Sequence, residues 1–97
     1  MADLGAASFA WVRHPVYTDL THRQVALLTI LCDSQGPHHI GKLAQWLGVS
    51  RSIVSRGTST LEYYGLARRA KDPDDARNCI VYATRTGAVL RNVMKGL

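Results

Sequence analysis

The residues with the clearest chemical pattern lie near the middle of the chain, between Arg51 and Tyr64. Only Gly57 opposes a helix in this run. At about 100° per residue, two arginines and three serines fall within one arc of about 140°; they are Arg51, Ser52, Ser55, Arg56 and Ser59. Arginine donates hydrogen bonds to guanine edges and to phosphates, and a serine hydroxyl adapts to either. This face therefore predicts a helix that lies in a DNA groove.

A polar face also occurs on ordinary solvated helices, so a second interpretation competes with this one. Such faces usually mix Lys, Arg and Glu, whereas the only acidic residue of this helix, Glu62, lies outside the arc and near the C-terminal end. We therefore favour recognition of double-stranded DNA. The alternative is a protein-interaction module in which the same face binds an acidic protein partner.

The signals at the ends of this helix agree with its assignment. Ser50 is placed to cap the N-terminus, because its hydroxyl can accept from a backbone N–H two or three residues on, and we also expect Ser50 to face DNA. Gly65 supplies a left-handed stop. Gly57 lies on the apolar side, where glycine costs about 1 kcal/mol relative to alanine. We expect it to mark the close approach of another element.

A shorter helix precedes this one. Ile40, Leu43, Ala44 and Leu47 recur at the spacing of an amphipathic helix, and Gly48 ends it. Two helices joined by a short turn that contains glycine form a helix-turn-helix unit. Off the apolar stripe of the first helix, Lys42 and Gln45 are expected to contact phosphates.

A basic hairpin follows the two helices. Residues 66–71 and 79–84 are short strand-like runs, and residues 72–78 between them are rich in turn-forming residues. A hairpin beside a recognition helix is a wing, and its cationic side chains are further candidates for DNA contact: Arg68, Arg69, Lys71 and Arg77. Asp75 is expected to hold the Arg77 guanidinium and aim it into a minor groove. The simpler interpretation is a surface ion pair with no role in binding.

The remaining segments are expected to support this unit. Residues 1–20 form an N-terminal segment, with a short helix from Ala6 to Arg13 and an extended link, and residues 21–97 form the DNA-binding domain. Thr21 and Gln24 form a capping box for a helix that is apolar on nearly all sides and hence central. Thr86 is expected to cap a last helix that packs through Val89, Leu90, Val93 and Met94. The predicted fold class is α+β, mostly helical with a small antiparallel sheet.

These motifs together resemble the winged helix-turn-helix of the MarR-type transcriptional regulators. Four motifs occur in the family's order: the entry Gly48-Val49-Ser50, the exit Leu61-Glu62 with Gly65-Leu66, the wing Asp75-Ala76-Arg77 and the close Thr84 to Gly87. In the last motif, Ala83 stands in place of a leucine. The likeness extends from Asp19 to about Leu90. It implies a DNA-binding regulator that acts as a homodimer on two half-sites one helical turn apart. Family members carry longer flanking helices that build a ligand crevice, so the short flanks here argue against a small-molecule effector.

Composition excludes several other classes. The chain of 97 residues has room for one domain, and its net charge of +5 favours nucleic acid or an acidic surface as partner. No apolar run is long enough for a membrane span and the N-terminus lacks the pattern of a signal peptide, so we expect a cytoplasmic protein. No nucleophile motif or phosphate-binding glycine loop is present, and we expect no enzyme activity and no cofactor.

The cysteines and histidines do not change this interpretation. Cys32 and Cys79 lack metal-ligand spacing and are expected to be small, partly buried residues, with a redox switch as the alternative. His38 and His39 would point to opposite faces of a strand and could not bind one metal ion together. We expect His39 to contact a DNA phosphate instead.

Overall fold

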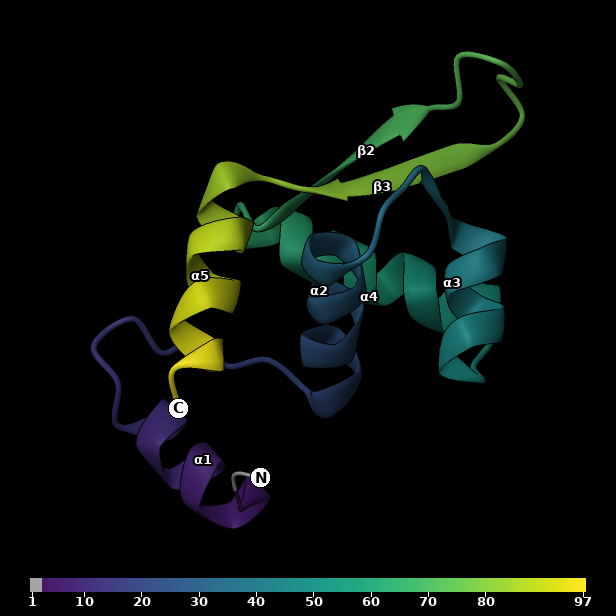
Figure 1. Cartoon of the computed structure of the whole chain (residues 1–97). Coiled ribbons are helices and arrows are strands. Elements are labelled where there is room, and N and C mark those ends of the chain that lie inside the picture. The colour runs from purple at the N-terminus through teal and green to yellow at the C-terminus, as the bar shows by residue number, and fades with distance from the viewer. Residues whose placement is uncertain (1–2) are drawn as a thin grey trace.

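The computed structural model of the protein describes residues 3–97 (Figure 1). Met1 and Ala2 of the predicted N-terminal segment lie outside the described residues. Within these residues, five helices and three strands follow in this order: α1 Leu4–Val12, α2 His22–Asp33, β1 His38–His39, α3 Ile40–Leu47, α4 Arg51–Tyr63, β2 Ala67–Lys71, β3 Cys79–Ala83 and α5 Arg85–Lys95. The predicted winged helix-turn-helix is confirmed, with α3 and α4 as the two helices of the unit.

The sheet is small and antiparallel. Its strand order is β1-β3-β2, so that β3 is central and β2 and β3 form the wing. The register places Arg69 opposite Val81 in the wing and His38 opposite Val81 on the other edge. Val81 is 1% exposed and anchors the sheet to the helices. In Figure 1 the β2–β3 hairpin extends beyond the helices, with its tip on the side of α3.

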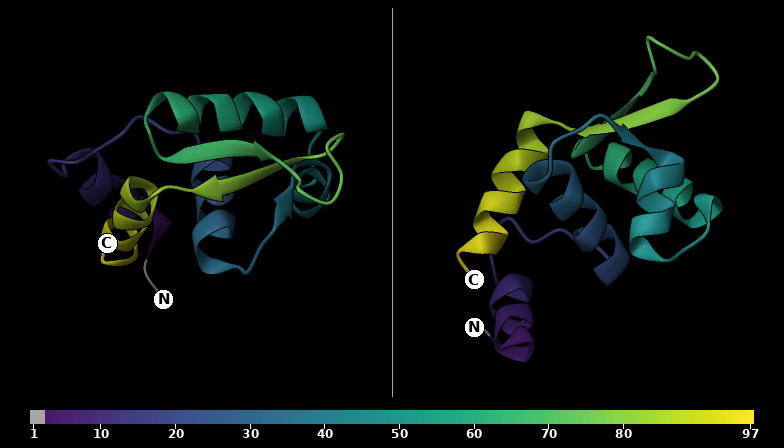
Figure 2. Two further views of the ribbon diagram at one scale, coloured as in Figure 1. Left: turned by 90° about the horizontal axis from the view of Figure 1, so that it is seen from above. Right: turned by 45° about the vertical axis from the view of Figure 1, so that its right-hand side comes forward.

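The apolar helix α2 is the centre of the domain, as its sequence predicts. Leu27 and Leu28 are fully buried and belong to one cluster with Leu43 of α3, Leu61 of α4 and Val81. Thr21 accepts from the backbone N–H of Gln24, whose side chain accepts from the backbone N–H of Thr21, so the capping box is confirmed. Figure 2 shows α2 between α5 and α3 in its right-hand view.

The helix ends follow the predicted stops. Gly48 ends α3 with φ 68° and Gly65 follows α4 with φ 73°. Both are left-handed conformations in which a side chain would be strained. These turns let α3 brace α4 and bring β2 back along α4.

The start of α5 differs from the sequence prediction. Thr84 caps this helix, not Thr86, because its hydroxyl accepts from the Gly87 backbone N–H at 3.1 Å and donates to the Gly65 carbonyl at 2.6 Å. The Thr84 backbone N–H also donates to the Leu66 carbonyl at 3.0 Å. We call this junction of Gly65, Leu66 and residues 84–87 the elbow. It ties the exit of α4 to the entry of α5.

The expected packing of α5 is wrong at Val89. Val89 is 58% exposed, while Leu90 and Met94 pack toward the core. On α4, Thr58 is a polar residue that is fully buried in the core. The Thr58 hydroxyl is satisfied because it donates to the Val54 carbonyl at 2.8 Å. A threonine that bonds its own helix can therefore be buried without an unpaired polar group.

The N-terminal helix α1 begins at Leu4, slightly earlier than the sequence predicts, because the Asp3 carboxylate accepts from the backbone N–H groups of Gly5 and Ala6. No residue of α1 is buried, although Trp11 packs partly against the core. Leu4, Phe9 and Val12 remain exposed. In Figure 1, α1 lies near the C-terminal end of α5, at a distance from α3 and the wing. None of the helices between residues 3 and 97 has the length and apolar character of a membrane span.

Candidate nucleic-acid interface

The polar arc of α4 faces solvent. Arg51, Ser52, Arg56 and Ser59 are exposed, and Ser55 is half-buried. The opposite face is held by Val54 and the other buried residues of the helix. The helix thus presents its predicted recognition face outward, because its apolar face is fixed against α2.

The predicted cap at Ser50 is confirmed, whereas the expectation for Gly57 is wrong. The Ser50 hydroxyl accepts from the Ile53 backbone N–H at 3.2 Å, so one of its lone pairs serves the helix cap. Gly57 faces α2, but a Cβ at this position would meet Leu27 Cδ2 at 3.6 Å and Gln24 Cγ at 3.9 Å. These are ordinary van der Waals distances. The approach of α2 therefore does not require glycine.

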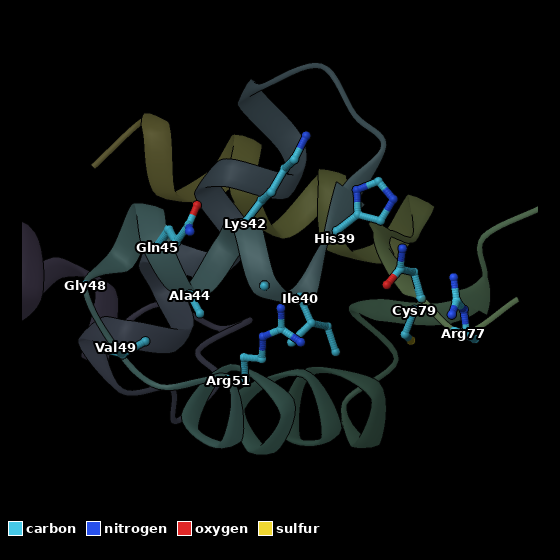
Figure 3. Close-up of a pocket in the computed structure, with 12 residues that line it drawn as sticks. His39, Ile40, Lys42, Ala44, Gln45, Gly48, Val49, Arg51, Arg77 and Cys79 are labelled. Carbon is cyan, nitrogen blue, oxygen red and sulfur yellow. The ribbon is translucent and has the colours of Figure 1, made fainter. Parts of the chain in front are cut away.

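An open groove of about 930 Å³ lies between α3, the start of α4 and the tip of the wing. Its polar lining comes from these three elements and from β1: His39, Lys42, Gln45, Arg51, Arg77 and Asn78. Figure 3 shows Lys42 and Gln45 on α3, Arg51 on α4 and Arg77 on the wing around this space. The structure therefore brings together four of the residues that the sequence nominated from separate segments. Asn78 also lines the groove, although no motif in the sequence marks it as a candidate.

The Arg51 side chain lines this groove and extends from α4 toward α3. Its guanidinium lies over Gly41, where an added Cβ would come within 2.7 Å of an Arg51 Nη atom. Figure 3 shows the guanidinium directed from α4 toward the start of α3, beside Ile40. Gly41 thus leaves room for Arg51, a relation that neither residue reveals in the sequence.

The tip of the wing contains the predicted pair of Asp75 and Arg77. Arg77 Nε donates to Asp75 Oδ1 at 3.2 Å, and an Nη atom lies 3.5 Å from Oδ2. Asp75 also accepts from the Arg77 backbone N–H at 3.1 Å and from the Asn78 amide at 3.4 Å. The Arg77 side chain is 90% exposed. One carboxylate therefore orients an arginine whose remaining N–H groups face solvent.

The root of the wing is tied to β1. His39 Nε2 lies 2.8 Å from Asp72 Oδ2, while Asp72 Oδ1 accepts from the Asp74 backbone N–H at 2.9 Å. Hydrogen bonding by His39 holds the pKa of the Asp72 carboxyl below its ordinary value. His39 therefore contacts Asp72 within the protein, which corrects the expectation that it serves a phosphate. The two residues are 33 positions apart, so their contact depends on the sheet register.

Arg69 behaves differently from the other basic residues of the wing. Its Nε donates to Glu62 Oε1 at 2.9 Å, and its Nη atoms donate to the Ser55 hydroxyl at 3.0 Å and to the Ser55 carbonyl at 2.8 Å. An Nη atom also contacts the Ser59 hydroxyl. Arg68 and Lys71, by contrast, are exposed and form no ion pair within residues 3–97. These three cations look equivalent in the sequence, but in the part of the chain that the structure describes only the Arg69 side chain is bound to other residues of the protein.

The cysteines lie outside this surface or at its edge. Cys32 packs partly against the core, and burial raises the pKa of its thiol, which lowers the thiolate fraction at neutral pH. Cys79 lines the groove, and both cysteines are free. Among residues 3–97, no group of three His, Cys, Asp or Glu side chains is placed to hold a metal ion.

The sequence profile of the MarR family matches residues 20–79, which is more than half of the chain. The chain belongs to the MarR family. The predicted resemblance is thereby confirmed, and with it a relation to transcriptional regulators and not to enzymes. No curated protein sequence matches the chain.

Solved structures of MarR-family proteins have the same fold. MepR of Staphylococcus aureus, in a complex with DNA, superposes with a TM-score of 0.84 at 21% identity, over 96% of this chain and 73% of MepR. FabT of Streptococcus pneumoniae, also in a complex with DNA, gives 0.82 at 15% identity, over 94% and 63%. A MarR-family transcriptional regulator from Rhodococcus sp. RHA1 gives 0.78 at 30% identity, over 96% and 62%. The present chain therefore spans less than two thirds of the length of FabT and of the Rhodococcus protein.

Proposed function

We propose that this protein is a transcriptional regulator that binds double-stranded DNA sequence-specifically, with α4 in the major groove and the β2–β3 wing on the minor groove or the backbone. One observation carries the proposal. The exposed arc of α4 has two arginines and no carboxylate, and its first arginine, Arg51, also lines the groove that Lys42 and Arg77 border. A recognition helix and a phosphate-binding surface are thereby continuous. Two structural neighbours, MepR and FabT, were crystallised with DNA, which supports this assignment.

We assign each proposed contact to a base or to the DNA backbone according to the position of the residue. The first turns of α4 enter a major groove in proteins of this kind, so Arg51, Ser52, Ser55 and Arg56 are assigned to base edges. Lys42, Gln45, Arg68 and Lys71 flank the helix and are assigned to phosphates, with Ser50 at the helix entry. Arg77 projects from the wing tip and is assigned to the minor groove, where arginine binds well.

We further propose that two copies act together. The α1 helix buries none of its own residues, and its Leu4, Phe9 and Val12 are exposed. In Figure 1, α1 lies near the C-terminal end of α5. A second copy covering α1 and α5 would remove these apolar side chains from water, which favours association. A symmetric dimer would place two α4 helices on half-sites about one helical turn apart.

Selection from a library of random duplexes, followed by anisotropy titration of the enriched sequence, tests the proposed function. We expect an enriched sequence with two related half-sites, bound more tightly than random DNA by at least about 10³-fold at physiological salt. Sedimentation should show a species larger than the 10.7 kDa monomer, at least on DNA. Equal affinity for all duplexes would contradict the proposal. It would favour the alternative of a module for acidic protein partners, and a monomer both free and on DNA would contradict the dimer.

A further inference from the structure

The contact between Arg69 and α4 has consequences for how the recognition helix can use its serines. Arg69 lies on β2, and its side chain contacts Ser55 and Ser59 on α4. It follows these serines by 14 and ten positions in the sequence. Nε donates one hydrogen bond, one Nη donates another, and the second Nη donates two, so four of the five guanidinium N–H groups are used inside the protein. The guanidinium side chain is 26% exposed and paired with Glu62.

The two serines have different hydrogen-bonding capacity left. The Ser59 hydroxyl donates its only proton to the Ser55 carbonyl at 3.1 Å and accepts from Arg69. It has no proton left for DNA. The Ser55 hydroxyl accepts from Arg69 at 3.0 Å, and within residues 3–97 no acceptor takes its proton. A serine that already accepts from a cation is available as a donor.

We infer that Arg69 is a positioning residue that sets the hydrogen-bond polarity of the recognition helix, so that Ser55 presents a donor to the bases and Ser59 does not. This inference rests on the proposed function. A donor at Ser55 requires an acceptor on the base edge: N7 of a purine, O6 of guanine or O4 of thymine. The N4 amino group of cytosine is itself a donor, so it can reach only the second lone pair of the Ser55 hydroxyl and leaves the Ser55 proton without an acceptor; cytosine is therefore disfavoured at that position.

Base analogues test the polarity directly. The duplex enriched by the wild-type chain is resynthesised with single replacements, using 7-deazapurines to remove N7, 2-aminopurine to remove O6 and 4-thiothymine to weaken O4. We expect one position per half-site at which the wild type loses about three- to tenfold in affinity, the value of one neutral hydrogen bond. Ser55→Ala should lose a similar factor on the natural duplex and become insensitive to the analogue at that position.

Ser59→Ala is the matched control, because it removes a hydroxyl from the same face without removing a free donor. It should keep the analogue sensitivity of the wild type. The inference is overturned if Ser55→Ala keeps the whole analogue profile, or if Ser59→Ala is the variant that loses it. If the wild type enriches no sequence at all, the proposed function fails and the inference fails with it.

Arg69→Lys separates a positioning role from a phosphate contact. Lysine keeps the charge, but a single ammonium cannot span Glu62 and both serines as the guanidinium fork does. We expect the ratio of specific to random affinity to fall by about three- to tenfold with an unchanged salt slope. Arg85→Lys, at an exposed arginine that is not assigned to DNA contact, should leave this ratio unchanged. If the Arg69→Lys protein folds and its ratio of specific to random affinity equals that of the wild type, the positioning role is contradicted. If Arg69→Lys does not fold, the serine variants decide the question.

Discussion

Gly87 and Gly41 both lie where an added methyl group would meet a neighbouring element, but the neighbours differ in kind. At the elbow, a Cβ on Gly87 would lie 2.1 Å from the Leu66 carbonyl oxygen, which is backbone and cannot move alone. In the groove, a Cβ on Gly41 would lie 2.7 Å from an Arg51 Nη atom, the end of a flexible side chain. The elbow is therefore held by main chain, and the groove by side chains that can rearrange.

The elbow and the groove also have different roles in the proposed function. The elbow fixes the direction in which α4 leaves the core and α5 begins, through Thr84 and the carbonyls of Gly65 and Leu66. The groove carries long cationic side chains that adjust to a nucleic-acid backbone. We therefore expect elbow substitutions to affect folding, and groove substitutions to affect binding in a protein that stays folded.

Gly87→Ala should have the largest effect. The new Cβ forces α5 away from Leu66, the residue before β2, and we expect a loss of about 3 kcal/mol or more in the free energy of unfolding. For a domain of this size the melting temperature would fall by roughly 12 °C or more. Gly41→Ala is the matched control and should melt close to the wild type while changing DNA affinity through Arg51. Similar melting temperatures for the two variants would remove the distinction between elbow and groove.

Arg56→Ala should have the largest effect on recognition without unfolding the protein. Arg56 is exposed on the arc and makes no ion pair within residues 3–97, so its removal leaves no buried charge unpaired. If it reads a base, the specific duplex should lose about 1–3 kcal/mol of binding free energy and random DNA little. Parallel anisotropy titrations on the two duplexes give the answer. Equal losses would reassign Arg56 to a phosphate.

The wing tip tests whether orientation outweighs charge. Arg77→Ala should weaken binding and reduce the slope of log affinity against log salt by about one unit. Asp75→Ala removes a negative charge, and simple electrostatics predicts tighter binding. We expect weaker binding, because Arg77 then loses the carboxylate that orients it. Tighter binding by Asp75→Ala together with a silent Arg77→Ala would show that the wing does not enter a groove.

Gly57→Ala should raise stability slightly. The added Cβ meets only Leu27 and Gln24, at 3.6 and 3.9 Å, and α4 gains helix propensity. We expect a gain of about 0.4–1 kcal/mol in the free energy of unfolding, measured by urea denaturation. The variant should bind DNA as the wild type does, because Gly57 faces α2. A loss of stability would mean that α2 and α4 approach more closely than the side-chain distances indicate.

The smallest expected effect is the pH dependence of the contact between α2 and α5. Arg91 donates to both oxygens of Asp33, at 2.7 to 3.2 Å, and these bonds lower the pKa of the carboxyl from its usual 3.8. The Asp33 carboxyl is harder to protonate in the folded state than in the unfolded state, so its contribution to the free energy of unfolding is present above about pH 4. This contribution is lost as the pH falls through the lowered pKa of Asp33 in the folded state. Asp33→Asn should therefore differ from the wild type at neutral pH and converge with it in acid melts; a constant difference would contradict this linkage.

Local signals in the sequence were sufficient for much of the fold. The capping box at Thr21, the cap at Ser50 and the stops at Gly48 and Gly65 each depend on residues within a few positions of one another. The choice of Thr84 over Thr86 could not be made in this way. Both threonines can cap a helix, and the distant Gly65 carbonyl favours Thr84.

The candidate site shows the same limit. The serine–arginine face of α4 follows from helical periodicity alone, and the Asp75–Arg77 contact spans two residues. The contacts of Arg69 with Ser55 and of His39 with Asp72 depend on how β2 lies along α4 and how β1 pairs with β3. Only the folded chain could show that Arg69 is engaged inside the protein while Arg68 is not.

Methylation interference on the enriched duplex tests the central claim most directly, because dimethyl sulfate marks guanine N7 in the major groove and adenine N3 in the minor groove. With α4 in the major groove, methylation of guanines should block binding in two clusters about one helical turn apart. With Arg77 in the minor groove, methylated adenines flanking these clusters should also interfere. Interference confined to minor-groove adenines, or none at any position, would contradict the placement of α4 as the recognition helix.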